Sequence, residues 1–385
     1  MNTYERVKKT LEALLSDTDR KVIALTGLWG IGKSHLWKDL HKTSADGKVK
    51  SAIYISIFGA KNIEEVKTRI LKTRILENGF LNDISDNKTL KVIFNTFGKG
   101  TESFLNKAFG VSLTEASLIL LPAFINNKLI VIDDIERCGE KLKVEEIMGF
   151  LNEYSETHQN QFLILLNTEK LHDPGKWKVL HEKVIDAEVA LNPTSKECFE
   201  KAKSHDFLQE KAIIDAICIL EIKNIRVIKK IIGHVKEIAA RFDVRNLPTQ
   251  CWVPSIVLLT AISYRADENL PTIEYVRSYT RLRKLMESSN SAQTKNPNEI
   301  KWRVLLGRLG LSYMGDFEEI FADYLETGLL EGDKLGNFFT IQNEEANNHI
   351  AINKKDDFLN SVQWDSHASD CELLVNARSL MESIS

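Results

Sequence analysis

The chain has 385 residues, of which 43% are hydrophobic and 27% are charged. This composition excludes a disordered or fibrous chain, and the length predicts two folded domains. The formal net charge of −3 gives no overall electrostatic reason for non-specific binding to DNA or to a membrane surface. Any such binding site is therefore expected to be local.

The cysteines and the apolar stretches indicate a cytoplasmic protein. The five cysteines lie far apart, without the spacing of zinc ligands, and the helical apolar spacing near the N-terminus is unlike a secretion signal. Two apolar stretches could suggest a membrane span, Ala108–Ile125 and Trp252–Ile262. The first is interrupted by Glu115 and Pro122, and the second is too short. We expect both to be core segments.

The first half of the chain alternates between strand patterns and helical patterns. A helical segment from Lys33 to about Lys42 follows the first apolar run. Nearly continuous apolar strands separated by helices predict a parallel sheet that is covered on both faces, and hence an α/β fold. The predicted strands are Lys21–Thr26, Ala52–Phe58, Leu129–Ile132, Phe162–Leu166 and Val184–Leu191.

The second half, from about Pro193, has helical periodicity and no strand-like runs. We expect an α/β domain at 1–192 with a long helical insertion at about 62–127, a helical lid at 193–250, and a C-terminal helical domain at 251–385. Between Pro271 and Arg308 basic residues outnumber acidic ones, and they are Arg277, Arg281, Arg283, Lys284, Lys295, Lys301, Arg303 and Arg308.

The segment Gly27–Ser34 reads GLWGIGKS and fits the pattern GxxxxGK[ST] at every specified position. It follows an apolar strand and precedes a helix, so backbone N–H groups and the helix N-terminus can face phosphates. Lys33 supplies a positive charge for the β- and γ-phosphates, and Ser34 a hydroxyl for Mg²⁺. The sequence therefore predicts binding of ATP with Mg²⁺ by Gly27, Trp29, Gly30, Ile31, Gly32, Lys33, Ser34 and His35.

Polar side chains follow two other predicted strands. Asp133 ends the run Leu129–Ile132 and is the candidate for holding the water shell of Mg²⁺. Asp134 or Glu136 is expected to be the general base, and the sequence does not distinguish between them. Asn167 ends the fourth strand, and it can reach the γ-phosphate or the attacking water if that strand lies between the other two.

These motifs resemble the KAP group of P-loop NTPases, in the class that has a strand inserted between the two nucleotide-binding strands. The loop resembles GxWGxGK[ST], and Ile132–Cys138 is similar to the form DDxDRC or DDxERC. The resemblance implies an α/β core with a helical lid, ATP hydrolysis, and an arginine of the lid, Arg226, that reaches the nucleotide. It continues in Ile55–Gly59, Gly149–Glu153, Asn167–Glu169, Glu182–Asp186 and Asn224–Lys230.

The chain departs from the group at two places. Lys183 stands where related ATPases place a residue that reaches a neighbour's nucleotide, and a lysine lacks the bidentate fork of arginine. This puts a ring held together by a trans-acting arginine in doubt. Some KAP proteins carry transmembrane helices between the two motifs, whereas segment 62–127 is not expected to span. The resemblance therefore implies a soluble member.

Bacterial relatives of this kind recur in antiphage defence, which suggests an ATP-dependent switch that acts as a homo-oligomer, with a defence effector protein, or both. The proposed role in defence rests on analogy of fold and family. A rival hypothesis is a nucleic-acid-binding regulator or loader whose ATPase core positions the basic segment Arg277–Arg308. A third is a catalytically slow nucleotide-binding scaffold, because Asp134 replaces the commoner glutamate.

Overall fold

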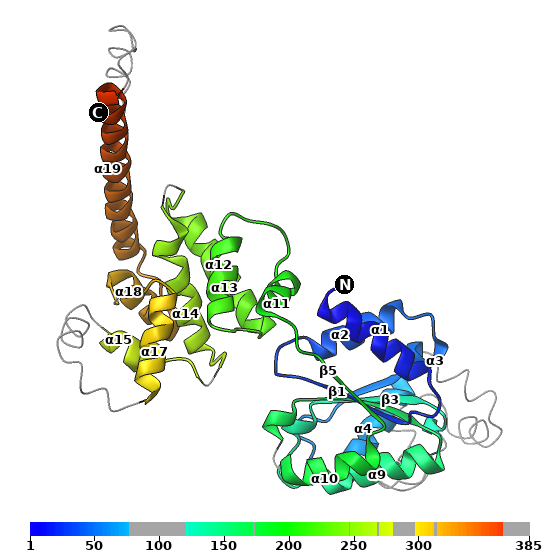
Figure 1. Ribbon diagram of the computed structural model, residues 1–385. Coiled ribbons are helices and arrows are strands. Elements are labelled where there is room, and N and C mark those ends of the chain that lie inside the picture. Colours follow the sequence, from blue (N-terminus) through cyan, green and yellow to red (C-terminus); the bar gives the residue numbers. More distant parts are fainter. Residues whose placement is uncertain are drawn as a thin grey trace. The chain divides into compact units, whose positions relative to one another are not determined.

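The computed structural model describes residues 1–76, 121–122, 124–171, 174–245, 247–267, 269–279, 297–311 and 314–364. The chain divides into two compact units, Met1–Glu197 and Cys198–Ser385 (Figure 1). Most of the predicted insertion, residues 77–120, lies outside the described residues. The expected boundaries at 192 and at 250 stay predictions.

The first unit contains a five-stranded parallel sheet in the order β2-β3-β4-β1-β5. This confirms the predicted α/β class. The fifth strand is shorter than expected, because α10 continues through Val184 before the chain turns into the sheet. The strands are β1 (Val22–Thr26), β2 (Ile53–Ser56), β3 (Leu129–Asp133), β4 (Gln161–Leu166) and β5 (Ala187–Ala190).

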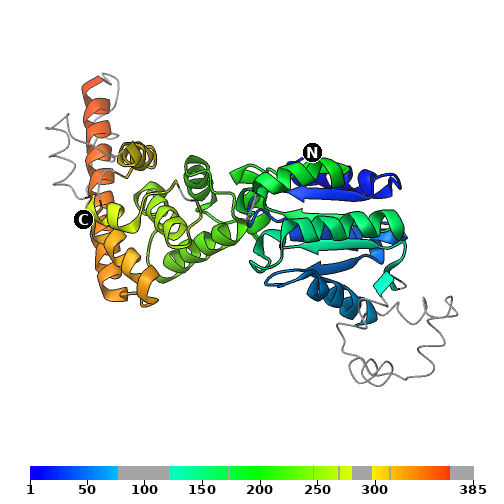
Figure 2. The same cartoon turned by 90° about the horizontal axis from the view of Figure 1, so that it is seen from below.

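Helices cover both faces of this sheet, as the continuous burial of β1, β3 and β4 requires. On one side lie α1 (Thr3–Ser16), α2 (Lys33–Thr43) and α3 (Gly47–Lys50). Figure 2 shows the helices that lie side by side across the other face. These are α4 (Ile63–Leu76), α9 (Val144–Thr157) and α10 (Pro174–Val184).

The first helix, α1, is tied to the nucleotide-binding loop. Asn2 and Glu5 form a capping box at its start, and the Thr3 N–H donates to Glu197 Oε1 over 2.7 Å. The Tyr4 hydroxyl then donates to the backbone oxygen of Ile31 over 2.9 Å. The N-terminal helix therefore supports the loop from the side.

The described residues of the second unit form helices joined by turns and loops, with no strand among them, as the sequence predicted. Its centre is α14 (Val253–Ser263), which is buried on all sides from Val253 to Ala261 and packs against α12, α13, α15 and α18. The helices around it are α12 (Glu210–Ile219), α13 (Ile225–Arg241), α15 (Ile273–Ser278), α17 (Pro297–Arg308), α18 (Asp316–Thr327) and α19 (Gly332–Trp364). A further helix, α11 (Ser195–Ala202), crosses the boundary between the units.

Neither apolar stretch forms a helix of membrane-spanning length within the described ranges, where every helix is too short or too polar to cross a bilayer. The stretch Trp252–Ile262 lies mainly in α14, whose buried side chains form the core of the second unit. This confirms the prediction of a core segment. Most of Ala108–Ile125 lies outside the described residues.

The register of the parallel strands brings the carboxyl ends of several strands to one edge of the sheet. Thr26 pairs with Leu166, and Asp133 pairs with both Leu165 and Ser56. Because β4 lies between β1 and β3, the loop after β1 and the acidic run after β3 leave the sheet on either side of Asn167. Ligands of open α/β folds bind at this carboxyl edge.

Candidate nucleotide-binding site

The loop Gly27–Ser34 connects β1 to α2, with a backbone that requires glycine. Gly27 has φ +152°, and a Cβ there would lie 2.4 Å from Ile31 Cδ1 and 2.6 Å from the Leu191 backbone oxygen. Gly30 and Gly32 also have positive φ, at 75° and 97°, and Gly32 is the N-cap of α2. Glycine adopts these angles without the steric cost that a side chain adds.

The backbone amides of the loop are available to an anion. None of the described residues accepts a hydrogen bond from the N–H groups of Gly30, Gly32, Lys33 or Ser34. These groups surround the N-terminus of α2, where the helix dipole adds partial positive charge. Free donors at a helix start are the arrangement that binds phosphate, so the loop fits a triphosphate. His35, also predicted to contact the nucleotide, is exposed in the first turn of α2.

The Lys33 side chain is folded back over the loop. Its ammonium donates to the backbone oxygens of Gly27 and Leu28 over 2.7 and 3.0 Å. Burial lowers the pKa of Lys33, while the negative charges of Glu136, Asp133 and Asp134 act to raise it. Lys33 uses two of its three N–H donors in these bonds, which leaves one donor for a ligand.

Asp133 is the meeting point of the loop and the sheet. Its Oδ2 accepts hydrogen bonds from Ser34 Oγ over 2.5 Å and from the Tyr54 hydroxyl over 2.8 Å. Burial raises the pKa of Tyr54, and the neighbouring Asp133 carboxylate raises it further. Among the described residues no group of three or more His, Cys, Asp or Glu side chains could hold a metal by itself. Mg²⁺ needs only one or two protein oxygens when phosphates and waters supply the others, so Ser34 and Asp133 fit it.

Asp134 lies beside this network in a left-handed backbone conformation, with φ 63°. Its N–H donates to Asp133 Oδ1 over 2.8 Å. Its Oδ2 accepts from Ser56 Oγ over 2.7 Å, and its Oδ1 lies 3.7 Å from a guanidinium nitrogen of Arg137. Its side chain is 28% exposed, so solvent reaches the carboxylate.

Glu136 has different surroundings, although it is only two residues away. It is buried, and its Oε1 accepts from the Trp29 indole N–H over 2.6 Å. Its buried Oε2 has no hydrogen-bond partner among the described residues. The Arg137 guanidinium lies over the exposed rings of Trp29 and Phe58, 5.6 and 4.4 Å from their centroids. The hydrogen bond between Trp29 and Glu136 links the loop to the acidic run after β3.

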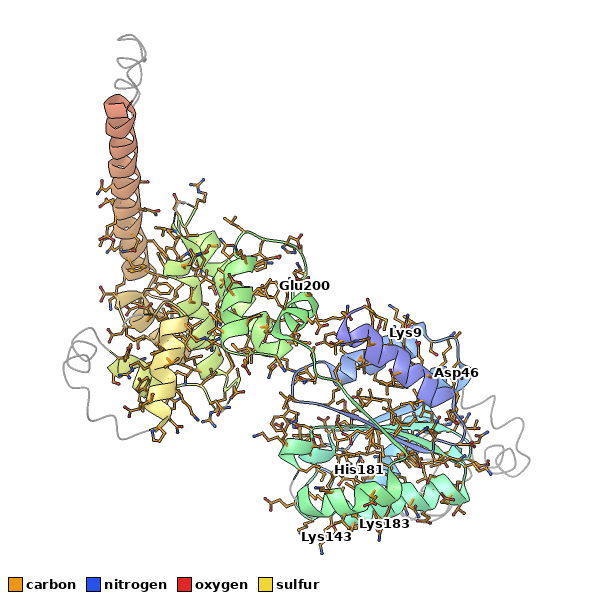
Figure 3. All side chains as sticks on the ribbon, viewed as in Figure 1. Lys9, Asp46, Lys143, His181, Lys183 and Glu200 are labelled. Carbon is orange, nitrogen blue, oxygen red and sulfur yellow. The ribbon has the colours of Figure 1, made fainter. Side chains whose placement is uncertain are left out.

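The remaining predicted residues lie at different places. Asn167 is buried after β4, where its Oδ1 accepts from the Glu169 N–H over 3.2 Å. The Gly27 N–H donates to the Leu166 oxygen over 3.2 Å, so Asn167 adjoins the start of the loop. Lys183 is exposed near the end of α10 (Figure 3). Arg226 is exposed in the first turn of α13, in the second unit.

Sequence reasoning missed Tyr54, Ser56 and Tyr4, whose hydroxyl groups contact this site. Tyr54 and Ser56 alternate with buried Ile53 and Ile55 along β2, so both lie on one face of the strand. That alternation is visible in the sequence. What it does not reveal is that β3 is the neighbouring strand.

The strand order and the loop together define the fold. A strand, β4, lies between the one that precedes the loop and the one that ends in Asp133, as expected for the class with an inserted strand. The first unit is an α/β P-loop NTPase core, and a helical region follows it.

Comparison with solved structures finds weak similarities. A structure of Cdc6p from Pyrobaculum aerophilum aligns at 14% identity, over 90% of this chain and 94% of that chain, with a TM-score of 0.40. A structure of Drosophila ORC bound to DNA aligns at 12% identity, over 84% and 77%, with a TM-score of 0.36. Drosophila ORC bound to AT-rich DNA and Cdc6 aligns at 12% identity, over 99% and 70%, with a TM-score of 0.27. No family model and no curated protein matches the chain.

Proposed function

We propose that the chain binds ATP with Mg²⁺ and hydrolyses it. The observation that carries this proposal is the contact of Ser34 with Asp133 at the end of a loop whose N–H groups at Gly30, Gly32 and Lys33 are free. The free N–H groups suit an anion, and the oxygens of Ser34 and Asp133 suit a divalent cation. A metal-bound triphosphate presents both charges. The Lys33 ammonium, which donates to the Gly27 and Leu28 carbonyls, would turn from them to the phosphates.

Ser34 and Asp133 would hold the Mg²⁺, directly or through water. When bound, the metal neutralises charge that develops on the phosphates during transfer. Of the two candidate bases we favour Asp134, because its carboxylate is partly exposed whereas that of Glu136 is buried. A base must meet the water it deprotonates, and Ser56 holds one oxygen of Asp134 in place.

The substitution Lys33→Ala tests the proposal in the full chain. Binding of a fluorescent ATP analogue and release of phosphate are both expected to fall to background, since the variant loses the cation of the site. Unchanged turnover would contradict an ATPase centred on this loop. If the wild type binds ATP but leaves it intact for hours with Mg²⁺, the slow scaffold would replace the enzyme as the better description.

The finer proposal is a KAP-like ATPase switch in bacterial antiphage defence, with Arg226 and Asn167 sensing the nucleotide. It is supported by the motif resemblance from the loop to the segment Asn224–Lys230. Asn167 adjoins the loop, and Arg226 occupies an exposed position at a helix start. Measuring the mass of the particle with and without ATP tests whether the chain forms a homo-oligomer. Arg226→Ala is expected to lower turnover while nucleotide binding persists.

The nucleic-acid alternative depends on the basic segment after Pro271. Arg277 forms ion pairs there with Asp323 over 2.7 Å and with Glu326 over 3.2 Å. These carboxylates offset the positive charge that Arg277 would offer to a phosphate. Lys301, Arg303 and Arg308 lie on α17, whereas Arg281, Arg283, Lys284 and Lys295 lie outside the described residues. Binding of DNA or RNA that weakens steeply with salt would support this alternative.

A further inference from the structure

Tyr54 lies on β2, and the proposed function assigns it no role. Its side chain is half-buried, and its hydroxyl donates to Asp133 Oδ2 over 2.8 Å. The backbone of β2 pairs with that of β3 from Ile53 to Ser56. A rigid strand that is hydrogen-bonded to the strand of Asp133 therefore presents this hydroxyl.

The Asp133 carboxylate is held by donors on both oxygens. Oδ1 accepts from the Asp134 N–H over 2.8 Å, and Oδ2 accepts from Ser34 and Tyr54. These donors differ in what happens when a metal arrives. The Ser34 hydroxyl is itself an expected metal ligand, whereas the Tyr54 hydroxyl is not. It donates to Asp133 and also lies within hydrogen-bonding reach of the Ser34 hydroxyl.

We propose that Tyr54 is a positioning residue for Asp133, the proposed Mg²⁺ ligand. Its hydroxyl keeps the carboxylate at the edge of the sheet while Ser34 turns its own oxygen toward the metal. Groups that hydrogen-bond to a metal ligand fix its orientation, and their loss typically lowers metal affinity or activity about 10- to 100-fold. The inference rests on the proposed ATPase function.

The test is Tyr54→Phe in the full chain, which removes one oxygen and keeps the ring. Binding of a fluorescent ATP analogue is measured in EDTA and across a Mg²⁺ titration. In EDTA the variant is expected to bind as the wild type does, within about twofold. Mg²⁺ is expected to increase the affinity for the nucleotide, and the Mg²⁺ concentration at the midpoint of this increase should be about 10- to 100-fold higher in the variant. Hydrolysis by the variant should recover at high Mg²⁺.

Tyr324→Phe is the matched control, because the Tyr324 hydroxyl donates to a carboxylate, Glu237 Oε2, over 3.1 Å in the second unit. It should leave the Mg²⁺ titration unchanged. A double variant of Tyr54→Phe with Asp133→Asn should bind metal no worse than Asp133→Asn alone, because the tyrosine acts through that carboxylate. Thermal unfolding of each variant separates these effects from misfolding.

Three results would overturn the inference. They are an unchanged Mg²⁺ midpoint in Tyr54→Phe, an equal loss of binding in EDTA and in Mg²⁺, and the same shift in the Tyr324 control. A wild-type chain that binds no nucleotide would instead refute the proposed function, and the inference with it. If the wild type binds nucleotide with Mg²⁺ and Tyr54→Phe has the same Mg²⁺ midpoint, only the inference about Tyr54 is refuted.

Discussion

Ser34 Oγ donates a hydrogen bond to Asp133 Oδ2 over 2.5 Å, although the two residues are 99 positions apart in the chain. The contact crosses the end of β4, because β4 lies between the strands that precede the two residues. On the proposed function, this hydroxyl at a helix start and this carboxylate at a strand end would together hold the divalent cation of the nucleotide.

Ser34→Ala should abolish most Mg²⁺-dependent turnover, because it removes both the proposed metal ligand and a donor to Asp133. We expect a loss of at least about tenfold in kcat, with binding of metal-free ATP retained. Ser34→Thr keeps the hydroxyl and should retain activity, since the loop pattern accepts either residue. Phosphate release at several Mg²⁺ concentrations measures both. Equal activity in the alanine variant would remove Ser34 from the metal site.

Gly27→Ala should destabilise the first unit and prevent nucleotide binding. The added Cβ meets Ile31 Cδ1 at 2.4 Å and the Leu191 oxygen at 2.6 Å, at a φ of +152°. We expect a loss of about 1–3 kcal/mol of unfolding free energy, measured by urea denaturation.

Gly149→Ala is the control for that substitution. Gly149 lies inside α9, where an added Cβ has no described atom within 4 Å. Alanine should stabilise the helix there by about 0.5–1 kcal/mol. Similar losses at both glycines would show that the loop is no more demanding than an exposed helix position.

Asp134→Asn and Glu136→Gln distinguish the two candidate bases. Asparagine tolerates the left-handed backbone at position 134, so this substitution removes the charge with little strain. We expect Asp134→Asn to lower kcat by at least about 100-fold while ATP binding persists. Glu136→Gln keeps an acceptor for the Trp29 indole and should lower kcat less. The opposite order, measured by single-turnover hydrolysis, would make Glu136 the base.

Glu197 should give the first unit an acid-sensitive contribution to stability. Burial acts to raise its pKa, but hydrogen bonds from Thr3 and Thr194 outweigh this effect and lower it. A lowered folded-state pKa stabilises the fold above the unfolded value, and the contribution is lost as pH falls through the folded pKa. Glu197→Gln should therefore cost about 1 kcal/mol at pH 7.

Urea unfolding at neutral pH and at about pH 3 tests this prediction. The free energies of unfolding of the wild type and of Glu197→Gln should converge as the carboxylate is protonated. Glu156→Gln, at an exposed position on α9, should follow the wild type throughout. A constant difference between the wild type and Glu197→Gln would show that the charge of Glu197 does not matter.

The sequence by itself determined the elements and their chemistry. Four apolar runs and one alternating run predicted the five strands. The spacing of Gly27, Gly32, Lys33 and Ser34 predicted the phosphate loop, because few other backbones need that pattern. Asp133 was identifiable as the polar residue that ends an apolar strand. These features are local, so a single stretch of chain carries each of them.

The resemblance implied that a strand separates β1 from β3, but only the tertiary structure decided that β2 is the other neighbour of β3, and therefore which side chains meet. The pairing of β2 with β3 brings Tyr54 to Asp133 and Ser56 to Asp134. The fold also distinguishes Asp134 from Glu136, which the sequence left equivalent. The turn after β3 leaves the Asp134 side chain partly exposed and buries that of Glu136, which accepts a hydrogen bond from Trp29. Strand order is a property of long-range packing, which no local pattern records.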